Sequence, residues 1–191
     1  PFHLIGHSWG GTYAAYYVQQ HPDRVGRLVL AEPGALNREA AEEVNVAAVD
    51  LFDGGTNGFL NTTDYLPPDG DARADHFYVV ALAGLNDDRD FLDYDFWRLG
   101  YRANVGINGW QGNFDGSYRF DFTTGLDAFQ GETLFLAGEA DGRLGLDFQL
   151  TYHAPFFAEP DVFWLEDATH AEILRRPESR AAIRDFLEEA P

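Results

Sequence analysis

The sequence predicts an α/β fold built on a parallel sheet, and its spacing of strand-like and helix-like stretches carries that prediction. Residues 2–5 form an apolar run of strand length. They are followed by a Gly-rich turn, by an apolar helical stretch at 12–20 and by a second short strand at 27–31. A strand, a helix and a strand in this order form a βαβ unit with parallel strands and a right-handed crossover. Two further strands, at 132–137 and 161–165, extend the same pattern.

Two helices complete this α/β part of the chain. One covers about 145–158, between the last two strands. The other covers 177–189, where Pro177 suits the first helical position and apolar residues recur on one face.

The middle of the chain, residues 37–129, has a different character and is predicted to be a separate insertion. Helices are expected at about 38–52, where Asn37 can act as the cap, and at about 73–86 and 89–103. The stretches between them are rich in Gly, Asn, Pro and Asp and predict loops, with a hairpin expected at Asp115-Gly116.

Composition limits the classes of function. The chain has 191 residues, the size of one domain, and carries 32 acidic against 13 basic residues, all Arg, for a net charge of −19. A negative field of this size argues against nucleic-acid and anionic-membrane partners, and no apolar run approaches the ~18 residues of a membrane span. The absence of Cys excludes disulfides, thiolate catalysis and Cys-bound zinc, and the absence of Lys excludes Schiff-base chemistry. We expect no cofactor and no metal, because paired acids such as Asp87-Asp88 lack a ligand-loop pattern.

The run GHSWGG at 6–11 matches G-x-S-x-G, with Ser8 between two glycines. Such a turn holds a nucleophile above the carboxyl edge of a sheet on a strained backbone, and Gly6 and Gly10 are expected to keep the space around it clear. The helix that follows directs its N-terminus at the site, and the Trp9 N–H is an expected oxyanion donor. The alternative is a plain strand-to-helix turn with Ser8 as a helix cap.

A nucleophilic serine needs a base and an acid that orients the base. Asp141 follows the strand at 132–137 and His170 follows the strand at 161–165, so both lie at the carboxyl edge. The alternatives are a turn role for Asp141, Glu139 as the acid and a surface role for His170; His7 is expected to neighbour the site rather than act as base.

Together these motifs resemble the α/β-hydrolase superfamily. The resemblance covers residues 1–36 and 130–191 and corresponds to the family's fifth to eighth strands with the nucleophile, acid and histidine loops. The stretches that carry it are FHLIGHSWGG…RLVLAEPGAL, ETLFLAGEAD and DVFWLEDATHAEIL. GHSWGG is most similar to proline iminopeptidase-like members, with esterases and C–C bond hydrolases close behind. The resemblance implies a mainly helical cap at 37–129, in which Trp97 and Trp110 are either substrate walls or cap core.

The resemblance also implies a mechanism and a substrate class. Ser8, His170 and Asp141 would carry out acyl transfer on a small molecule or short peptide, and Glu32 would pair with a substrate amino terminus or be a plain loop residue. The family's first four strands and its second oxyanion donor have no counterpart in the sequence. We therefore expect this chain to be the C-terminal part of a hydrolase, with weak activity on its own. Its expected partner is the missing N-terminal segment of the same hydrolase. A non-catalytic module of the same fold is the remaining alternative.

Overall fold

The computed structural model describes residues 1–44 and 118–188. The chain divides into two compact units, residues 1–41 with 120–191 and residues 42–119, and the first contains the sheet. The helices expected at 73–86 and 89–103, the hairpin, Trp97 and Trp110 all lie outside the described residues. The division of the sequence at 36/37 and 129/130 stays a prediction.

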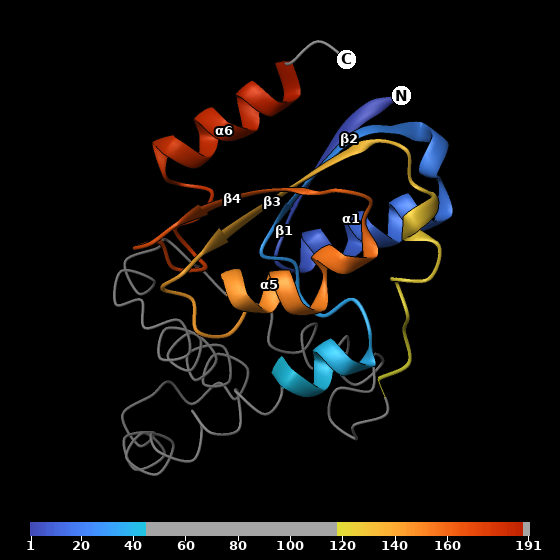
Figure 1. The fold of residues 1–191 in the computed structure, drawn as a ribbon, viewed down its shortest axis with the longest axis horizontal. Helices are drawn as coiled ribbons and strands as arrows, with labels where there is room; N and C mark the ends of the chain where they lie inside the picture. Colours follow the sequence, from blue (N-terminus) through green and yellow to red (C-terminus); the bar gives the residue numbers. More distant parts are fainter. Residues whose placement is uncertain (45–117, 189–191) are drawn as a thin grey trace, which may run out of the picture. The chain divides into compact units, whose positions relative to one another are not determined.

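Four parallel strands form the sheet, in the order β1-β2-β3-β4 (Figure 1). They are β1 (Phe2–His7), β2 (Val25–Ala31), β3 (Glu132–Gly138) and β4 (Asp161–Leu165). In the central register, Leu30 lies opposite Gly6 on one side and Phe135 on the other. The predicted parallel sheet is thus confirmed, and the carboxyl ends of all four strands lie at one edge.

The helices differ from the prediction at their ends. α1 (Trp9–Gln20) begins three residues before the expected start, because the Gly-rich turn itself forms the first helical turn. α5 (Leu146–Tyr152) is shorter than the predicted 145–158, and a 3₁₀ turn at Ala154–Phe156 with Pro155 at its start follows it. Proline cannot continue an α-helix because it lacks the N–H group and clashes with the preceding turn.

The remaining helices begin where their sequence signals place them. α6 (Pro177–Glu188) starts at the proline. A further helix begins at residue 38, and the Asn37 side chain caps it by accepting a hydrogen bond of 2.9 Å from the Ala40 N–H.

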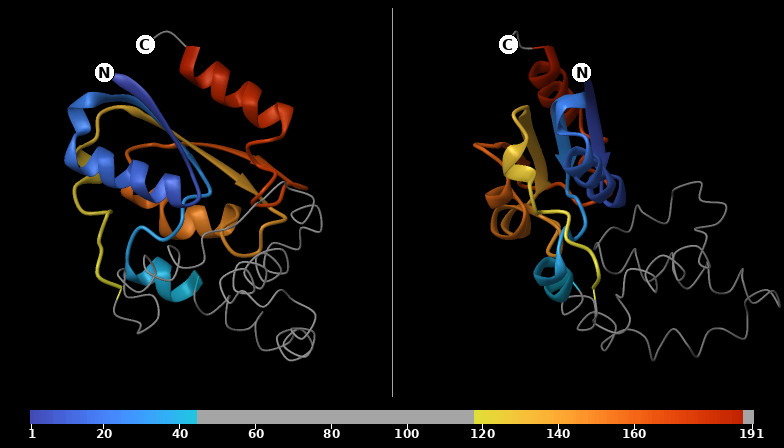
Figure 2. Two further views of the ribbon diagram at one scale, coloured as in Figure 1. Left: turned by 180° about the vertical axis from the view of Figure 1, so that it is seen from behind. Right: turned by 90° about the vertical axis from the view of Figure 1, so that its right-hand side faces the viewer.

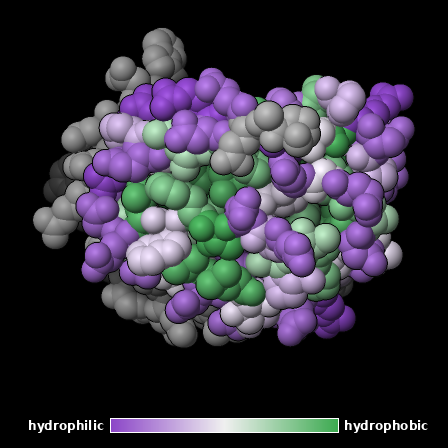
Figure 3. Space-filling model, turned by 45° about the horizontal axis from the view of Figure 1, so that its top comes forward, coloured by the Kyte–Doolittle hydropathy of each residue, from purple (hydrophilic) through white to green (hydrophobic). Residues whose placement is uncertain are grey.

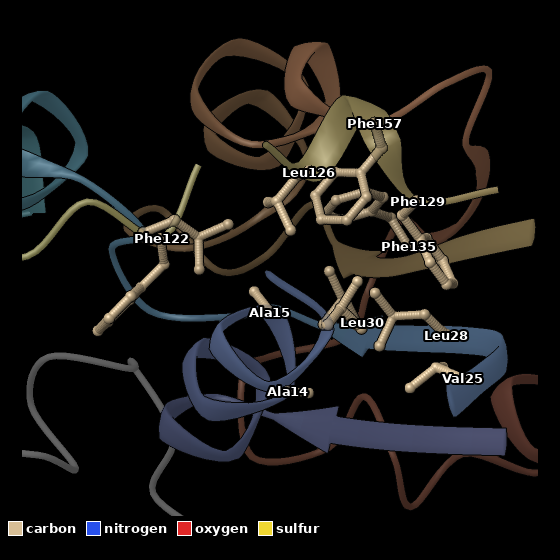
Figure 4. Close-up of a cluster of buried hydrophobic side chains, with 12 residues drawn as sticks. Ala14, Ala15, Val25, Leu28, Leu30, Phe122, Leu126, Phe129, Phe135 and Phe157 are labelled. Carbon is tan, nitrogen blue, oxygen red and sulfur yellow. The ribbon is translucent and has the colours of Figure 1, made fainter. Parts of the chain in front are cut away.

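Apolar residues cover both faces of the sheet, because successive side chains of a strand point to opposite faces. Leu28 and Leu30 of β2 belong to a core cluster with α1, shown in Figure 4, whereas Val29 and Ala31 belong to a second cluster with α6. The first cluster also takes in Phe135 and several other phenylalanines: Phe122, Phe129 and Phe157. The turned views in Figure 2 show α1 and α6 on opposite sides of the strands.

In the described part of the chain, β1 and β4 are the outer strands of the sheet. Phe2 and Ile5 of β1 are each 47% exposed and Trp164 of β4 is 48% exposed. Figure 3 shows apolar residues gathered in the middle of one face and ringed by polar ones. Among the described helices, none combines the length and the apolar character that crossing a bilayer requires.

Candidate active site

Ser8 stands between the end of β1 and the start of α1 in a strained backbone conformation. Its φ is 53° and its ψ is −122°, a region that side chains disfavour and that clusters at functional sites. Backbone hydrogen bonds hold it there: the Ser8 N–H donates to the Ala31 carbonyl at 3.0 Å, and the Ser8 carbonyl accepts from Gly11 at 2.9 Å and Gly34 at 3.1 Å. The turn therefore has the conformation that presents a nucleophile above a sheet edge.

Two glycines make this turn possible, but one of them is not where the motif suggests. A Cβ on Gly6 would overlap the Gly10 carbonyl oxygen, and a Cβ on Gly11 would lie 2.7 Å from the Pro33 Cβ. A Cβ on Gly10 would meet nothing within 4 Å. The expectation that Gly10 keeps the space clear is therefore wrong, and Gly11 has that role because α1 passes close to the chain after β2.

The first turn of α1 follows Ser8 directly. Trp9 is its first residue, and N–H groups in the first turn of a helix have no acceptor within the helix. The Ser8 side chain makes no capping hydrogen bond, so the alternative interpretation of Ser8 as a side-chain cap does not describe this turn. The Trp9 N–H stays the expected oxyanion donor.

His170 follows β4 and is the residue on which the site converges. Its ring is buried, with the residue 8% exposed. Its Nδ1 lies 2.7 Å from Glu32 Oε2 and 3.3 Å from Asp141 Oδ2. His7, next to Ser8, donates from Nε2 to the His170 carbonyl at 2.9 Å, and the two rings lie with their centroids 4.7 Å apart and their planes tilted by 31°. The histidine loop is thus attached to the strand end that carries the serine.

Within the described residues, the structure shows no hydrogen bond between Ser8 and His170. Among the hydrogen bonds of residues 1–44 and 118–188, none joins the Ser8 hydroxyl to the His170 ring. Catalytic hydrogen bonds are often long without substrate and tighten in the reacting complex.

Asp141 sits in the loop after β3, where the sequence places it. It is 5% exposed, and its Oδ1 accepts the Arg143 N–H at 3.0 Å. The N–H of Gly145, the residue before α5, donates to the Asp141 carbonyl at 3.1 Å and so closes the loop. Glu139, the competing acid, is exposed, which makes Asp141 the acid of this loop that faces His170.

Glu32 does not lie where a substrate contact was expected. Its side chain is fully buried, with Oε2 on His170 and Oε1 accepting the Gly138 N–H at 2.6 Å. Its φ of 42° directs the side chain back across the sheet edge. This burial and the contact with His170 argue against pairing with a substrate amino group, and the substrate-binding role of Glu32 stays a prediction.

The charges of these groups are strongly coupled. Burial alone would lower the pKa of His170, but the neighbouring carboxylates of Asp141 and Glu32 outweigh it and raise the pKa to about 9. Burial raises the pKa of Glu32 to about 7, against the hydrogen bond from His170. Burial also disfavours the Asp141 carboxylate, but its hydrogen bonds prevail and keep its pKa below the ordinary value. The site therefore favours a charged imidazolium.

Further residues support the site and carry no signal in the sequence. Gln149 of α5 donates to the Pro33 carbonyl at 3.2 Å and to the Leu144 carbonyl at 2.7 Å, and so connects the chain after Glu32 with the acid loop. His153 holds Gln149 by donating from Nδ1 to Oε1 at 2.7 Å. A buried Gln inside a predicted helix has no pattern that distinguishes it from a surface residue.

One trio in the described part of the chain has the composition of a metal site. His7, Glu32 and His170 each offer a ligand atom, and these atoms lie within 4.8 Å of one another. His170 and Glu32 already bond to each other, and His7 bonds the His170 carbonyl. A metal ion would have to displace these hydrogen bonds.

Comparison with known proteins identifies the fold family. The family model described as the alpha/beta hydrolase fold matches residues 1–145. The chain belongs to this alpha/beta hydrolase family. The predicted fold class is therefore confirmed.

Solved structures of similar fold include several enzymes. Est816, described as an N-acyl homoserine lactone degrading enzyme, is 18% identical, with 95% of this chain and 66% of that chain covered and a TM-score of 0.54. A bacterial membrane phospholipase A is 20% identical, with 98% and 56% covered and a TM-score of 0.55. The esterase EaEST from Exiguobacterium antarcticum is 16% identical, with 98% and 66% covered and a TM-score of 0.54. This chain spans 56–66% of the length of these three proteins.

Proposed function

We propose that this chain carries the catalytic residues of a serine hydrolase that works through an acyl-enzyme. The observation that supports this most strongly is the buried His170 ring, held through Nδ1 by carboxylates and attached through His7 to the strained turn of Ser8. A strained serine, an imidazole and an orienting acid are the parts that nucleophilic acyl transfer requires.

In the proposed reaction, the Ser8 oxygen attacks the substrate carbonyl carbon while His170 Nε2 takes the hydroxyl proton. The Trp9 N–H stabilises the negative charge on the former carbonyl oxygen. The imidazolium then gives its proton to the leaving alcohol or amine, and an acyl-serine remains. Water repeats the sequence, releasing the acid and restoring Ser8. Throughout, the carboxylates on Nδ1 hold the ring and stabilise its positive charge.

A carboxylic ester is the substrate class that we propose first. A proline iminopeptidase-like activity, indicated by the likeness of GHSWGG to those members, is the second candidate. The additional support expected from Glu32 is weakened, because this side chain is buried against His170. An amide leaving group is also the harder one to expel, because it needs protonation by His170 as it departs.

Parallel assays of p-nitrophenyl esters and prolyl-arylamides test both parts of the proposal. We expect ester turnover that disappears in Ser8→Ala, weakens strongly in Asp141→Asn and is unchanged in Glu139→Gln, the matched control on the same loop. Ester turnover that persists without Ser8 would refute the serine mechanism. Prolyl-arylamide turnover faster than ester turnover would replace the esterase proposal by the aminopeptidase.

A further inference from the structure

Two carboxylates converge on a single N–H group in this site. Glu32 comes from the end of β2 and Asp141 from the loop after β3, and each presents an oxygen to His170 Nδ1. A histidine that serves as a base needs only one such partner to fix its ring and tautomer. The presence of a second carboxylate therefore needs a separate explanation.

The geometry favours Glu32 as the partner of the N–H. Its Oε2 is 2.7 Å from His170 Nδ1, within the range of a charge-assisted hydrogen bond. Asp141 Oδ2 lies 3.3 Å from the same nitrogen and has no hydrogen-bond partner in the described part of the chain. The other Glu32 oxygen is fixed by the Gly138 N–H. The Glu32 backbone is fixed as well, because its N–H donates to the Leu136 carbonyl at 3.0 Å.

We propose that Glu32 is a positioning residue for His170, which takes the Nδ1–H hydrogen bond, while Asp141 supplies a second negative charge beside it. The inference rests on the proposed function only for its catalytic consequence. As a statement about the contacts and charge of His170, it stands on the geometry alone.

The charge around His170 gives this arrangement a measurable consequence. In the described part of the chain, the titratable groups that face the ring are Glu32, Asp141 and His7. His7 is neutral near pH 7, because burial and the neighbouring His170 lower its pKa to about 4. The two carboxylates thus dominate, and the imidazolium is held until alkaline pH. His170 becomes a free base only when the pH rises through its elevated pKa, so catalysis should increase toward alkaline pH.

Removing one of the two charges should move that transition. A carboxylate in hydrogen-bond contact shifts the pKa of its partner by about one to three units. In Glu32→Gln, which keeps the size of the side chain, we expect the pKa of His170 to fall by about one unit or more. In Glu139→Gln, which removes an exposed acid close by in sequence, we expect no shift.

NMR titration of His170 in the 191-residue chain is the experiment, with Glu32→Gln, Asp141→Asn and Glu139→Gln measured side by side. A shift in both Glu32→Gln and Asp141→Asn, with none in Glu139→Gln, is the expected result. A shift confined to Asp141→Asn would overturn the proposal. If Glu32→Gln does not fold, titration of ¹³C-labelled Glu carboxyls in the unmodified chain replaces it. Glu32 should then titrate above the ordinary carboxyl range and respond again when His170 loses its proton, and an ordinary titration without that response would overturn the proposal.

A second readout separates this inference from the proposed function. The rate at which a fluorophosphonate labels Ser8 should rise with pH, and in Glu32→Gln the rise should move to lower pH with a reduced plateau. Labelling that depends on Ser8 but has the same pH profile in Glu32→Gln would refute the positioning role and leave the serine mechanism intact. An absence of Ser8 labelling in any form, with the NMR shifts as expected, would refute the serine mechanism and leave the contact between Glu32 and His170 intact.

Discussion

Substitution of Gly6 by Ala tests the turn that carries Ser8, the proposed nucleophile. A Cβ at this position would overlap the Gly10 carbonyl oxygen and lie 2.7 Å from the Gly10 carbonyl carbon and the Gly11 Cα. All three atoms belong to the backbone of the first turn of α1, so no side-chain rotation relieves the clash. Ordinary contacts of this kind are longer by nearly an ångström, and either β1 or α1 has to shift by about that distance.

The magnitude follows from the cost of overpacking a rigid site. Forced insertion of a methyl group destabilises a packed core by about 1–3 kcal/mol. A site made of backbone is expected at the upper end, because it cannot change rotamer. The same shift moves Ser8 relative to His170, so labelling of the serine by a fluorophosphonate should fall more than stability does; an ångström of misplacement costs about 100-fold in rate.

Gly10→Ala is the matched control, since a Cβ there meets nothing within 4 Å. Ala favours a helix over Gly by about 1 kcal/mol, so this variant should keep or gain stability and should label normally. Urea denaturation gives the stability and mass spectrometry gives the labelling. Equal behaviour of the two alanine variants would refute the close approach of β1 and α1 at the turn.

Two buried histidines give opposite pH dependences of stability. In the folded chain the pKa of His170 is raised to about 9, whereas in the unfolded chain it is about 6.5. The protonated ring therefore stabilises the fold fully below about pH 6.5, and this stabilisation is lost as the pH rises toward 9. In His170→Ala, the urea midpoint should no longer decline over this alkaline range. Burial lowers the pKa of His153 to about 3, so the unfolded chain binds its proton first and stability falls as the pH drops from about 6.5 toward 3. His153→Gln should flatten that acidic decline, and an unchanged acid slope would contradict the burial of His153.

The positions of the proposed catalytic residues were predictable because the carboxyl ends of parallel strands lie at one edge of the sheet. Ser8, Asp141 and His170 each follow an apolar strand, and the topology β1-β2-β3-β4 places those ends at one edge. Sequence alone could not foresee that Glu32, also at a strand end, turns inward. That direction depends on its φ of 42° and on the Gly138 N–H that receives it, and neither leaves a pattern in the sequence.

The glycines show the same limit at a smaller scale. The motif predicted that a side chain at Gly6 or at Gly10 would collide with a neighbouring element, but the close contacts are at Gly6 and at Gly11. The difference arises because Gly11 packs against Pro33, a residue more than twenty positions away, whereas Gly10 faces outward. Local spacing can predict a sharp turn, but which helix residue contacts a distant loop depends on packing.

The most direct test of the account is to locate where a fluorophosphonate reacts. The proposal predicts an adduct on Ser8, found by peptide mass spectrometry, that forms faster at alkaline pH and is greatly reduced in His170→Ala. An adduct on another residue, or equal labelling of Ser8 with and without the His170 imidazole, would contradict the claim that this serine is activated by this histidine.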